Sequence, residues 1–242
     1  MAALFFYQKP VVLNRDLHRK LKIRSQPSLA YSAKVNSIPL TAGEFVPAAR
    51  QLPIVFVQDA NGNPTPVALL GLRRDENLFV DADGRWMGSY VPAFIRRYPF
   101  VLIEKETPGD FMVGIDEQFP GFDTDEGEPL FAEDGSEGPP LKRALEFLNA
   151  YQTEARRTLE FMAHLKRLDL LIPRVINVNM KGGVTFTVDG FSVVDEAKLM
   201  KLGEKEAGSL LQSGVLGWIY MHLLSIHNLQ DLSARLDQKA AA

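Results

Sequence analysis

The stretch from residue 52 to residue 100 constrains the fold of this chain most strongly, because it alternates short β-type runs with tight-turn signals. Residues 53–58, 67–72 and 77–80 are rich in the branched and aromatic residues that favour strands. Between them lie an Asn- and Gly-rich turn and the pair Asp83-Gly84, whose residues tolerate the positive φ angles of tight turns. This pattern predicts an antiparallel sheet, since short turns join strands that run in opposite directions.

Further elements follow in the same half of the chain. Residues 98–105 and 111–116 are predicted strands, and residues 90–97 form a predicted short helix that tolerates Pro92 in its first turn. The segment 121–140 is acidic and rich in Gly and Pro, which predicts a mobile loop.

The second half of the chain changes to helical patterning. Apolar residues recur at helical spacing between residues 140 and 171, and Pro173 lies just beyond that end. Residues 174–178 and 184–188 are predicted to form a hairpin around the turn Lys181-Gly182-Gly183.

Two more helices are predicted near the C-terminus. Asp195 is expected to cap a short helix that ends at residue 202, and residues 206–235 are expected to form the last helix. Strands first and helices later indicate an α+β fold, with a mainly antiparallel sheet in the N-terminal half packed against helices from the C-terminal half. We expect one domain over residues 1–242.

Composition excludes several kinds of chemistry and partner. The chain has no cysteine, so disulfides, thiolate catalysis and cysteine-ligated metals are excluded. Its formal net charge of −3 argues against a general affinity for nucleic acid. The first apolar run is shorter than a secretory signal requires and no basic residue precedes it, so we expect a cytoplasmic protein.

Residues 207–230 contain no Asp, Glu, Lys or Arg and are long enough to span a bilayer. They include two histidines and several Ser, Asn and Gln residues, each of which costs free energy in hydrocarbon. The flanking residues are acidic or mixed rather than basic on one side. A buried helix is therefore the favoured interpretation, and no membrane span is expected.

Motifs for metals, cofactors and nucleophiles fail on spacing. His222 and His227 are five residues apart, about 140° around a helix, whereas a shared ion needs a spacing of three or four residues. Because His222 lies among large apolar residues, we expect a core histidine with satisfied hydrogen bonds. The Asp-rich turns lack the ligand positions of a calcium loop, and no phosphate cradle or nucleophile elbow is complete. No metal, cofactor or catalytic residue is predicted.

The remaining candidate is the aromatic and arginine-rich segment from residue 86 to residue 100. Arginine offers a planar five-donor fork that suits carboxylates and phosphates, and it stacks on aromatic rings. The candidate ligand-binding residues are Trp86, Tyr90, Arg96, Arg97 and Tyr98. The alternative is a core aromatic cluster whose arginines pair with the acidic stretch 104–137, which has twelve acids and one base.

Several segments occur in an order that is more specific than any one of them. They are Pro53-Ile-Val-Phe, Ala68-Leu-Leu-Gly-Leu, Glu76-Asn-Leu-Phe-Val, Gly84-Arg-Trp, Ile95-Arg-Arg-Tyr-Pro-Phe, Gly190-Phe-Ser-Val-Val-Asp-Glu-Ala-Lys-Leu and Leu224-Ser-Ile-His-Asn-Leu. With these segments, over roughly residues 30–232, the chain resembles the bacterial SapC-like family. The resemblance implies an accessory role in peptide or nutrient handling, by association with surface-layer loci, and implies no catalytic residues. The permease label given to some similar proteins conflicts with this sequence, which lacks the several spanning helices that a permease needs.

Three hypotheses about function follow. The first is a soluble, non-enzymatic accessory protein that holds a peptide or protein partner on the segment 86–100. The second is an enzyme that acts on a small acid or peptide, which requires a set of polar residues to converge in space. The members of that set are Asp81, Asp83, Asp116, Glu117 and His222. The third is a homo-oligomer with the uncharged helix 207–230 at its interface.

Overall fold

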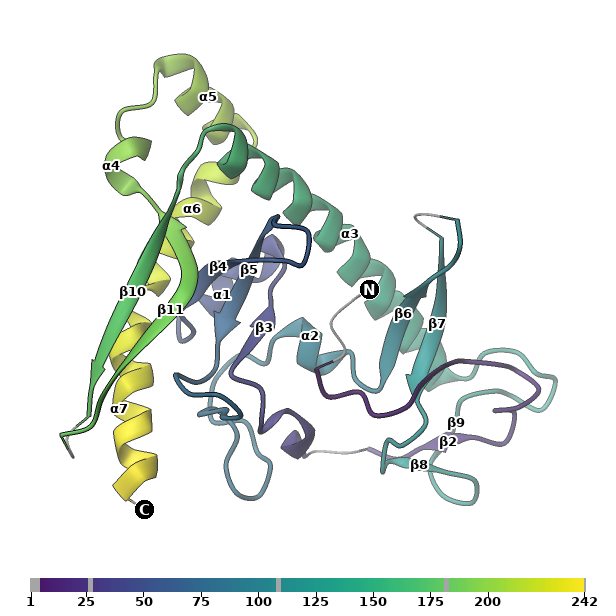
Figure 1. Cartoon of the computed structure of the whole chain (residues 1–242). Coiled ribbons are helices and arrows are strands. Elements are labelled where there is room, and N and C mark those ends of the chain that lie inside the picture. Colours follow the sequence, from purple (N-terminus) through teal and green to yellow (C-terminus); the bar gives the residue numbers. More distant parts are fainter. Residues whose placement is uncertain (1–4, 26–27, 108–109, 181–182, 242) are drawn as a thin grey trace.

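The computed structural model describes residues 5–25, 28–107, 110–180 and 183–241. Its largest sheet has five antiparallel strands in the order β10-β11-β4-β5-β3 (Figure 1). These strands are β3 (Ser37–Pro39), β4 (Ile54–Gln58), β5 (Pro64–Leu69), β10 (Leu171–Asn179) and β11 (Thr185–Val194). Val55 lies opposite Val67 between β4 and β5, and Ser192 of β11 lies opposite Phe56 of β4. The sheet therefore joins N-terminal strands to a hairpin from the second half of the chain.

Two smaller antiparallel sheets lie at the other end of the molecule (Figure 1). One has the order β1-β7-β6 and the other the order β8-β2-β9. Their strands are β1 (Pro10–Val12), β2 (Lys22–Ile23), β6 (Phe100–Glu104), β7 (Phe111–Asp116), β8 (Phe122–Asp123) and β9 (Glu128–Pro129). Because β2 pairs with β8 on one side and β9 on the other, the acidic segment 121–140 contains short strands where a loop was predicted. The mobility of that segment stays a prediction.

Helices connect and cover the sheets. They are the 3-10 helices η1 (Ala30–Ser32) and η2 (Ala42–Glu44), and the α-helices α1 (Phe45–Ala48), α2 (Ala93–Arg96), α3 (Pro139–Arg167), α4 (Glu196–Leu199), α5 (Glu204–Gln212), α6 (Val215–Ser225) and α7 (Asn228–Ala241). Helix α3 runs diagonally from the β10–β11 hairpin to the β6–β7 pair (Figure 1). It begins at proline, which suits a first turn that needs no N–H donor. Asp195 caps α4 as predicted, by accepting a hydrogen bond from the Lys198 N–H at 3.0 Å.

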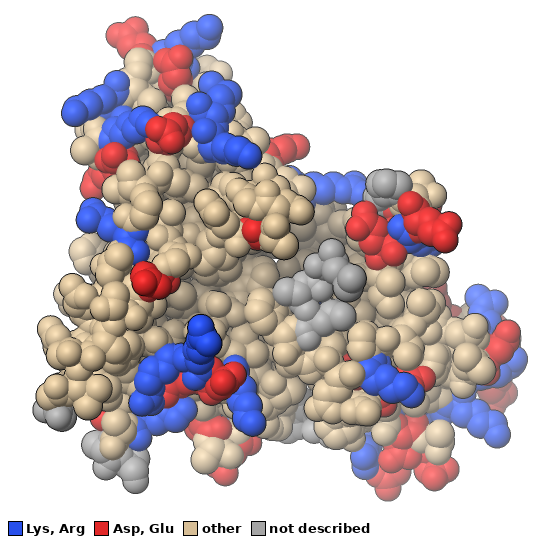
Figure 2. All heavy atoms as spheres, in the orientation of Figure 1, with Lys and Arg blue, Asp and Glu red and all other residues tan. Residues whose placement is uncertain are grey.

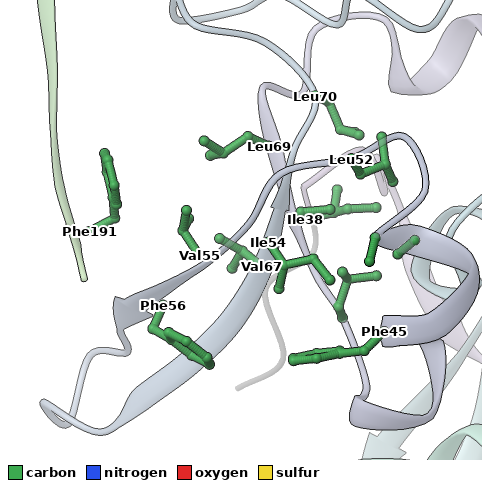
Figure 3. Packing of buried hydrophobic residues seen from close by; sticks show 14 of the residues in the cluster. Ile38, Phe45, Leu52, Ile54, Val55, Phe56, Val67, Leu69, Leu70 and Phe191 are labelled. Atoms are coloured by element: carbon green, nitrogen blue, oxygen red, sulfur yellow. The ribbon is translucent and has the colours of Figure 1, made fainter. Parts of the chain in front are cut away.

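The main core lies against the five-stranded sheet. The Phe161 ring of α3 packs 5.6 Å from the Phe45 ring and 6.2 Å from the Phe56 ring, measured between centroids. Figure 3 shows the Phe45 side chain of α1 and the Phe56 side chain of β4 pointing toward each other, with Ile54 of β4 beside them. A smaller apolar cluster lies under the N-terminal part of α3, where it includes Leu141. The predicted α+β architecture is confirmed.

The predicted strand at 77–80 and the predicted last helix differ from the structure. Residues 77–80 form no strand, because the Asn77 side chain binds the Ser32 carbonyl at 3.0 Å and accepts from the Phe79 N–H at 2.8 Å. The predicted last helix is divided into α5, α6 and α7, since Gly214 between α5 and α6 has a φ of 77° that a continuing helix cannot contain. The predicted turn at 181–183 lies partly outside the described residues.

The segment 207–230 is only partly buried, contrary to the prediction. Helix α6 buries Ile219 and His222, whereas Tyr220 and Leu224 are exposed on its other side. Among the described residues, no single helix is long and apolar enough to cross a membrane. One pair, Glu204–Gln212 with Val215–Ala240, passes that test by length and composition only and is bent by 88°.

Candidate functional site

Helix α2 and the residues after it carry the arginines of the candidate site. The buried carboxylate of Glu44 accepts hydrogen bonds from the Ala93 N–H at 2.7 Å and from the Tyr90 hydroxyl at 2.8 Å. It thereby holds the first turn of α2, whose free N–H groups need acceptors. A cis peptide bond between Tyr98 and Pro99 follows α2 and leads into β6.

An aromatic cluster forms one side of the site. The Tyr98 ring lies 4.3 Å from the Tyr31 ring and 5.3 Å from the Phe119 ring, between centroids. Both tyrosine hydroxyls already donate hydrogen bonds, from Tyr31 to the Ile95 carbonyl at 3.0 Å and from Tyr98 to the Asp116 carboxylate at 3.1 Å. Burial raises the pKa of both hydroxyls, and the Asp116 charge raises that of Tyr98 further. Both side chains are therefore neutral near pH 7.

Arg96 lies at the exposed side of α2. Its guanidinium carbon is 5.0 Å from the centre of the Phe147 ring and 5.7 Å from that of the Tyr90 ring. Its Nε donates to the Val91 carbonyl at 2.9 Å. These contacts hold the charge of Arg96 over aromatic faces, where cation–π attraction stabilises it.

Arg97 is buried, with 6% of its surface exposed. Its guanidinium carbon lies 3.8 Å from the centre of the Phe94 ring, 5.4 Å from that of Tyr151 and 5.8 Å from that of Tyr7. Its Nε and Nη2 atoms are buried and have no hydrogen-bond partner within the described part of the chain. A buried cation that lacks a carboxylate partner is costly, so this arrangement calls for an explanation.

The acidic stretch 104–137 pairs with other arginines. Arg143 of α3 lies 3.1 Å from Glu128, and Arg24 lies 3.6 Å from Asp123, as ion-pair distances. Within the described ranges, neither Arg96 nor Arg97 forms an ion pair with this stretch. The alternative interpretation, a core aromatic cluster, required ion pairs between Arg96 or Arg97 and the acidic stretch. In the structure, Arg24 and Arg143 form ion pairs with that stretch instead.

A cavity of about 400 Å³ lies beside these residues, within the size range of small-ligand pockets. Its polar and aromatic lining consists of Arg24, Ser25, Tyr31, Arg96, Arg97, Tyr98, Phe100, Phe119, Glu128, Arg143 and Phe147. A second cavity of about 390 Å³ shares Arg96 and Phe147 with it and is also lined by Tyr90, Glu154 and Arg157. Arg96 and Phe147 thus separate two neighbouring hollows along one face of α3. We refer to the two together as the Arg96–Arg97 cleft.

The structure brings together four of the five predicted ligand-binding residues. Arg96, Arg97 and Tyr98 line the first cavity, and Tyr90 lines the second. Trp86 lies apart from both, since its ring stacks on that of Phe79 at 5.4 Å and an interplanar angle of 20°.

Sequence reasoning missed several lining residues, among them Arg24, Tyr31, Arg143 and Phe147. Arg143 and Phe147 are four residues apart on α3 and therefore share a face of that helix, which the helical periodicity could have indicated. Arg24 and Tyr31 reach the cleft from the N-terminal segment and carry no local signal.

The residues of the enzyme hypothesis do not converge. Asp81 and Asp83 both pair with Arg85 inside one turn, at 3.1 and 2.5 Å. Asp116 is buried, whereas the neighbouring Glu117 points outward, as expected for adjacent residues at the end of a strand. Within the described residues there is no group of three or more His, Asp or Glu side chains that could hold a metal ion.

His222 is a core residue with both ring nitrogens hydrogen-bonded, which confirms the prediction. Its Nδ1 lies 2.8 Å from the Ile54 carbonyl and its Nε2 accepts from the Val194 N–H at 3.0 Å. These partners assign the proton of the neutral ring to Nδ1, since a carbonyl can only accept. Burial lowers the pKa of His222 to about 4, although the Ile54 carbonyl partly opposes this.

A larger groove, of about 670 Å³, lies between the β10–β11 hairpin and helices α6 and α7. Its lining is mainly apolar, and two of its residues, Val175 and Leu224, are 58% and 56% exposed. Figure 2 shows acidic and basic side chains mixed over α4 and α5, while the lower part of the hairpin carries few charges on the visible face. Four charged or ionisable residues, Arg174, Asp195, Glu196 and His227, also line this apolar groove.

Comparison with known protein families gives a match over most of the chain. The family model described as SapC matches residues 13–232, which is most of the chain. Neither the curated proteins nor the solved structures gave a match.

Proposed function

This chain belongs to the SapC family, and we propose that it is a soluble, non-enzymatic accessory protein that holds a peptide or protein partner in the Arg96–Arg97 cleft. We propose a cytoplasmic location for this role. The partner supplies an acidic group to the arginines and apolar or aromatic surface to the rings around them.

The observation that carries the proposal is the exposed Arg96, which lines both cavities and whose guanidinium lies over the rings of Phe147 and Tyr90. Ligand pockets combine apolar and aromatic walls with a few placed polar groups, and the cleft has this composition. A bound acidic group would pair with the Arg96 guanidinium, which forms no ion pair within the described part of the chain. The scattered positions of the acids and His222 favour binding over the enzymatic alternative.

The experiment is a capture assay with the whole chain as bait in a lysate of the source organism. Recovered peptides and proteins are identified by mass spectrometry and then tested singly. Arg96→Ala and Arg97→Ala are each expected to weaken capture by about tenfold or more, because a hydrogen bond to a charged group contributes about 1.5–3 kcal/mol.

Arg156→Ala is the matched control, since Arg156 is an exposed arginine on α3 that lines neither cavity of the cleft. Circular dichroism and thermal unfolding check that each variant is folded. Undiminished capture by both cleft variants contradicts the proposal.

We also propose that copies of the chain associate through α6. The motivating observations are the exposed Tyr220 and Leu224 on that helix and the apolar groove beside them. A contiguous exposed apolar surface is typical of protein interaction sites.

A further inference from the structure

We propose that the apolar groove binds a second copy of this chain across a two-fold axis, so that Arg174 of each copy pairs with Glu196 of the other. The inference rests on the proposed association through α6 and specifies its geometry and its charged contacts. It concerns the groove between the β10–β11 hairpin and helices α6 and α7, which shares no lining residue with the Arg96–Arg97 cleft.

The groove contains one basic and one acidic side chain that the chain itself leaves unpaired. Arg174 of β10 and Glu196 of α4 both line the groove, and both are exposed. Within the described residues, neither of them forms an ion pair. The other acid of the lining, Asp195, is occupied, because it accepts a hydrogen bond from the Lys198 N–H as the cap of α4. The groove therefore offers a guanidinium fork and a carboxylate to a partner.

These two charges lie toward opposite ends of the groove. Leu171 of β10 lies opposite Val194 of β11, and Arg174 is three residues further along β10, about 10 Å at the rise of a strand. Glu196 follows Val194 in the other direction, where α4 continues beyond the end of the hairpin (Figure 1). One end of the groove is therefore basic and the other acidic, and the two side chains are too far apart to pair within one chain.

An apolar stripe accompanies the two charges. Tyr220 and Leu224 are one turn apart on α6, line the groove and are exposed, and Val175 is an exposed residue on the hairpin side. The Tyr220 hydroxyl lies 3.9 Å from Sδ of Met200, which is also exposed, so the apolar surface continues beyond the groove. Contiguous apolar surface of this kind is typical of protein interaction sites.

The arrangement of charges favours a second copy of the same chain as the occupant. In a two-fold interface a surface meets itself in the reverse direction, so the basic end of one groove faces the acidic end of the other. A partner of one charge sign would leave one of the two ends unpaired or repelled. A lipid surface would need an excess of basic residues around the apolar face, whereas Figure 2 shows acidic and basic side chains mixed over α4 and α5.

Exchange of the two charges tests the pairing in the whole chain. Arg174→Glu and Glu196→Arg each place like charges opposite one another at two symmetric positions. Sedimentation equilibrium is expected to show the dissociation constant of the dimer raised about a hundredfold in each variant alone. An equimolar mixture of the two variants is expected to regain the wild-type constant, because opposite charges then face each other at both positions.

Two exposed residues of α3 provide matched controls. Arg156→Glu and Glu160→Arg make the same changes of charge, and neither residue lines the groove or the cleft. Each control is expected to dissociate within about twofold of the wild type, since exposed charges away from an interface contribute little. Circular dichroism checks that every variant is folded.

Two results overturn the inference: a charge variant that associates as tightly as the wild type, or a mixture that stays as weak as the single variants. If Leu224→Asp still separates the copies in that case, association through α6 stands and only the two-fold pairing of charges fails. A monomeric wild type overturns both the association and the pairing. It leaves the proposed ligand binding in the Arg96–Arg97 cleft untouched, because that site is separate from the groove.

Discussion

At the scale of single residues, the buried polar groups of this chain differ in whether the protein supplies their partners. Glu44 and Asp116 are saturated by donors, and His222 has one partner on each ring nitrogen. Their roles are therefore structural. Arg97 differs because its Nε and Nη2 atoms have no hydrogen-bond partner among the described residues, and its guanidinium lies against aromatic rings instead.

The titration of His222 predicts how stability depends on pH. Its pKa is about 4 in the folded chain, against an ordinary value of 6.5, so the unfolded chain takes up the proton first as the pH falls. The contribution of His222 to the free energy of unfolding is therefore expected to fall by about 3 kcal/mol between roughly pH 6.5 and pH 4, and to level off below that range. Urea unfolding at a series of pH values measures it.

His222→Gln is expected to be less stable at neutral pH and to lack this part of the pH dependence. His227→Gln is the control, because His227 is exposed and lies on the same chain segment. A pH profile of His222→Gln that parallels the wild type between pH 4 and pH 6.5 would show that the native ring is not held neutral.

At the scale of elements, the boundaries depend on local backbone conformation and on caps. Helix α2 is short because it begins only after Pro92, and its first turn depends on Glu44, which is remote in the sequence. The separation of α5 from α6 depends on the single left-handed residue Gly214.

Two glycine substitutions are expected to have opposite effects on stability. Gly214→Ala forces a Cβ atom into a left-handed conformation, so the free energy of unfolding is expected to fall by about 1–2 kcal/mol. Gly208→Ala lies inside α5, where an added Cβ meets nothing within 4 Å, so that energy is expected to rise by about 0.5–1 kcal/mol. Chemical denaturation measures both, and equal effects of the same sign would contradict the assigned break between the helices.

At the scale of the whole molecule, α3 connects the parts that the sequence presents separately. It reaches from the five-stranded sheet to the two small sheets (Figure 1) and contributes Phe147 and Arg143 to the cleft on the way. The apolar groove between the hairpin and α6 lies elsewhere, so the proposed ligand binding and the proposed self-association concern different surfaces.

Self-association through α6 is expected to show in the solution mass. Light scattering of the wild type is expected to give a dimer or larger assembly, and Leu224→Asp is expected to shift it toward the monomer because a charge disfavours an apolar interface. Leu159→Asp is the control, since Leu159 is an exposed leucine on α3, 70% accessible. A monomeric wild type, or equal masses for the two variants, contradicts the α6 interface.

The sequence by itself determined the elements and the chemistry available to them. The strand β7 falls on the predicted residues, Asp195 caps its helix as expected, and the position of Arg96 and Arg97 beside aromatic residues is visible in the chain. These features are local, because turn chemistry, capping and side-chain type act over a few residues. Residues 77–80, which form no strand, and the helix break at Gly214 show the limit of such local features. Both depend on side-chain contacts and backbone angles that the local sequence pattern does not reveal.

Only the tertiary structure decided that Arg97 is buried without a carboxylate partner among the described residues. The acids that could have paired with Arg97 are held by donors far from it in sequence, such as the Lys9 N–H on Asp116, and the acidic stretch pairs with Arg24 and Arg143 instead. Likewise His222 depends on Ile54, 168 residues away. The burial of a polar group and the identity of its hydrogen-bond partners are properties of the packed chain. Each carboxylate can accept only a few hydrogen bonds, and the fold determines which donors come within reach.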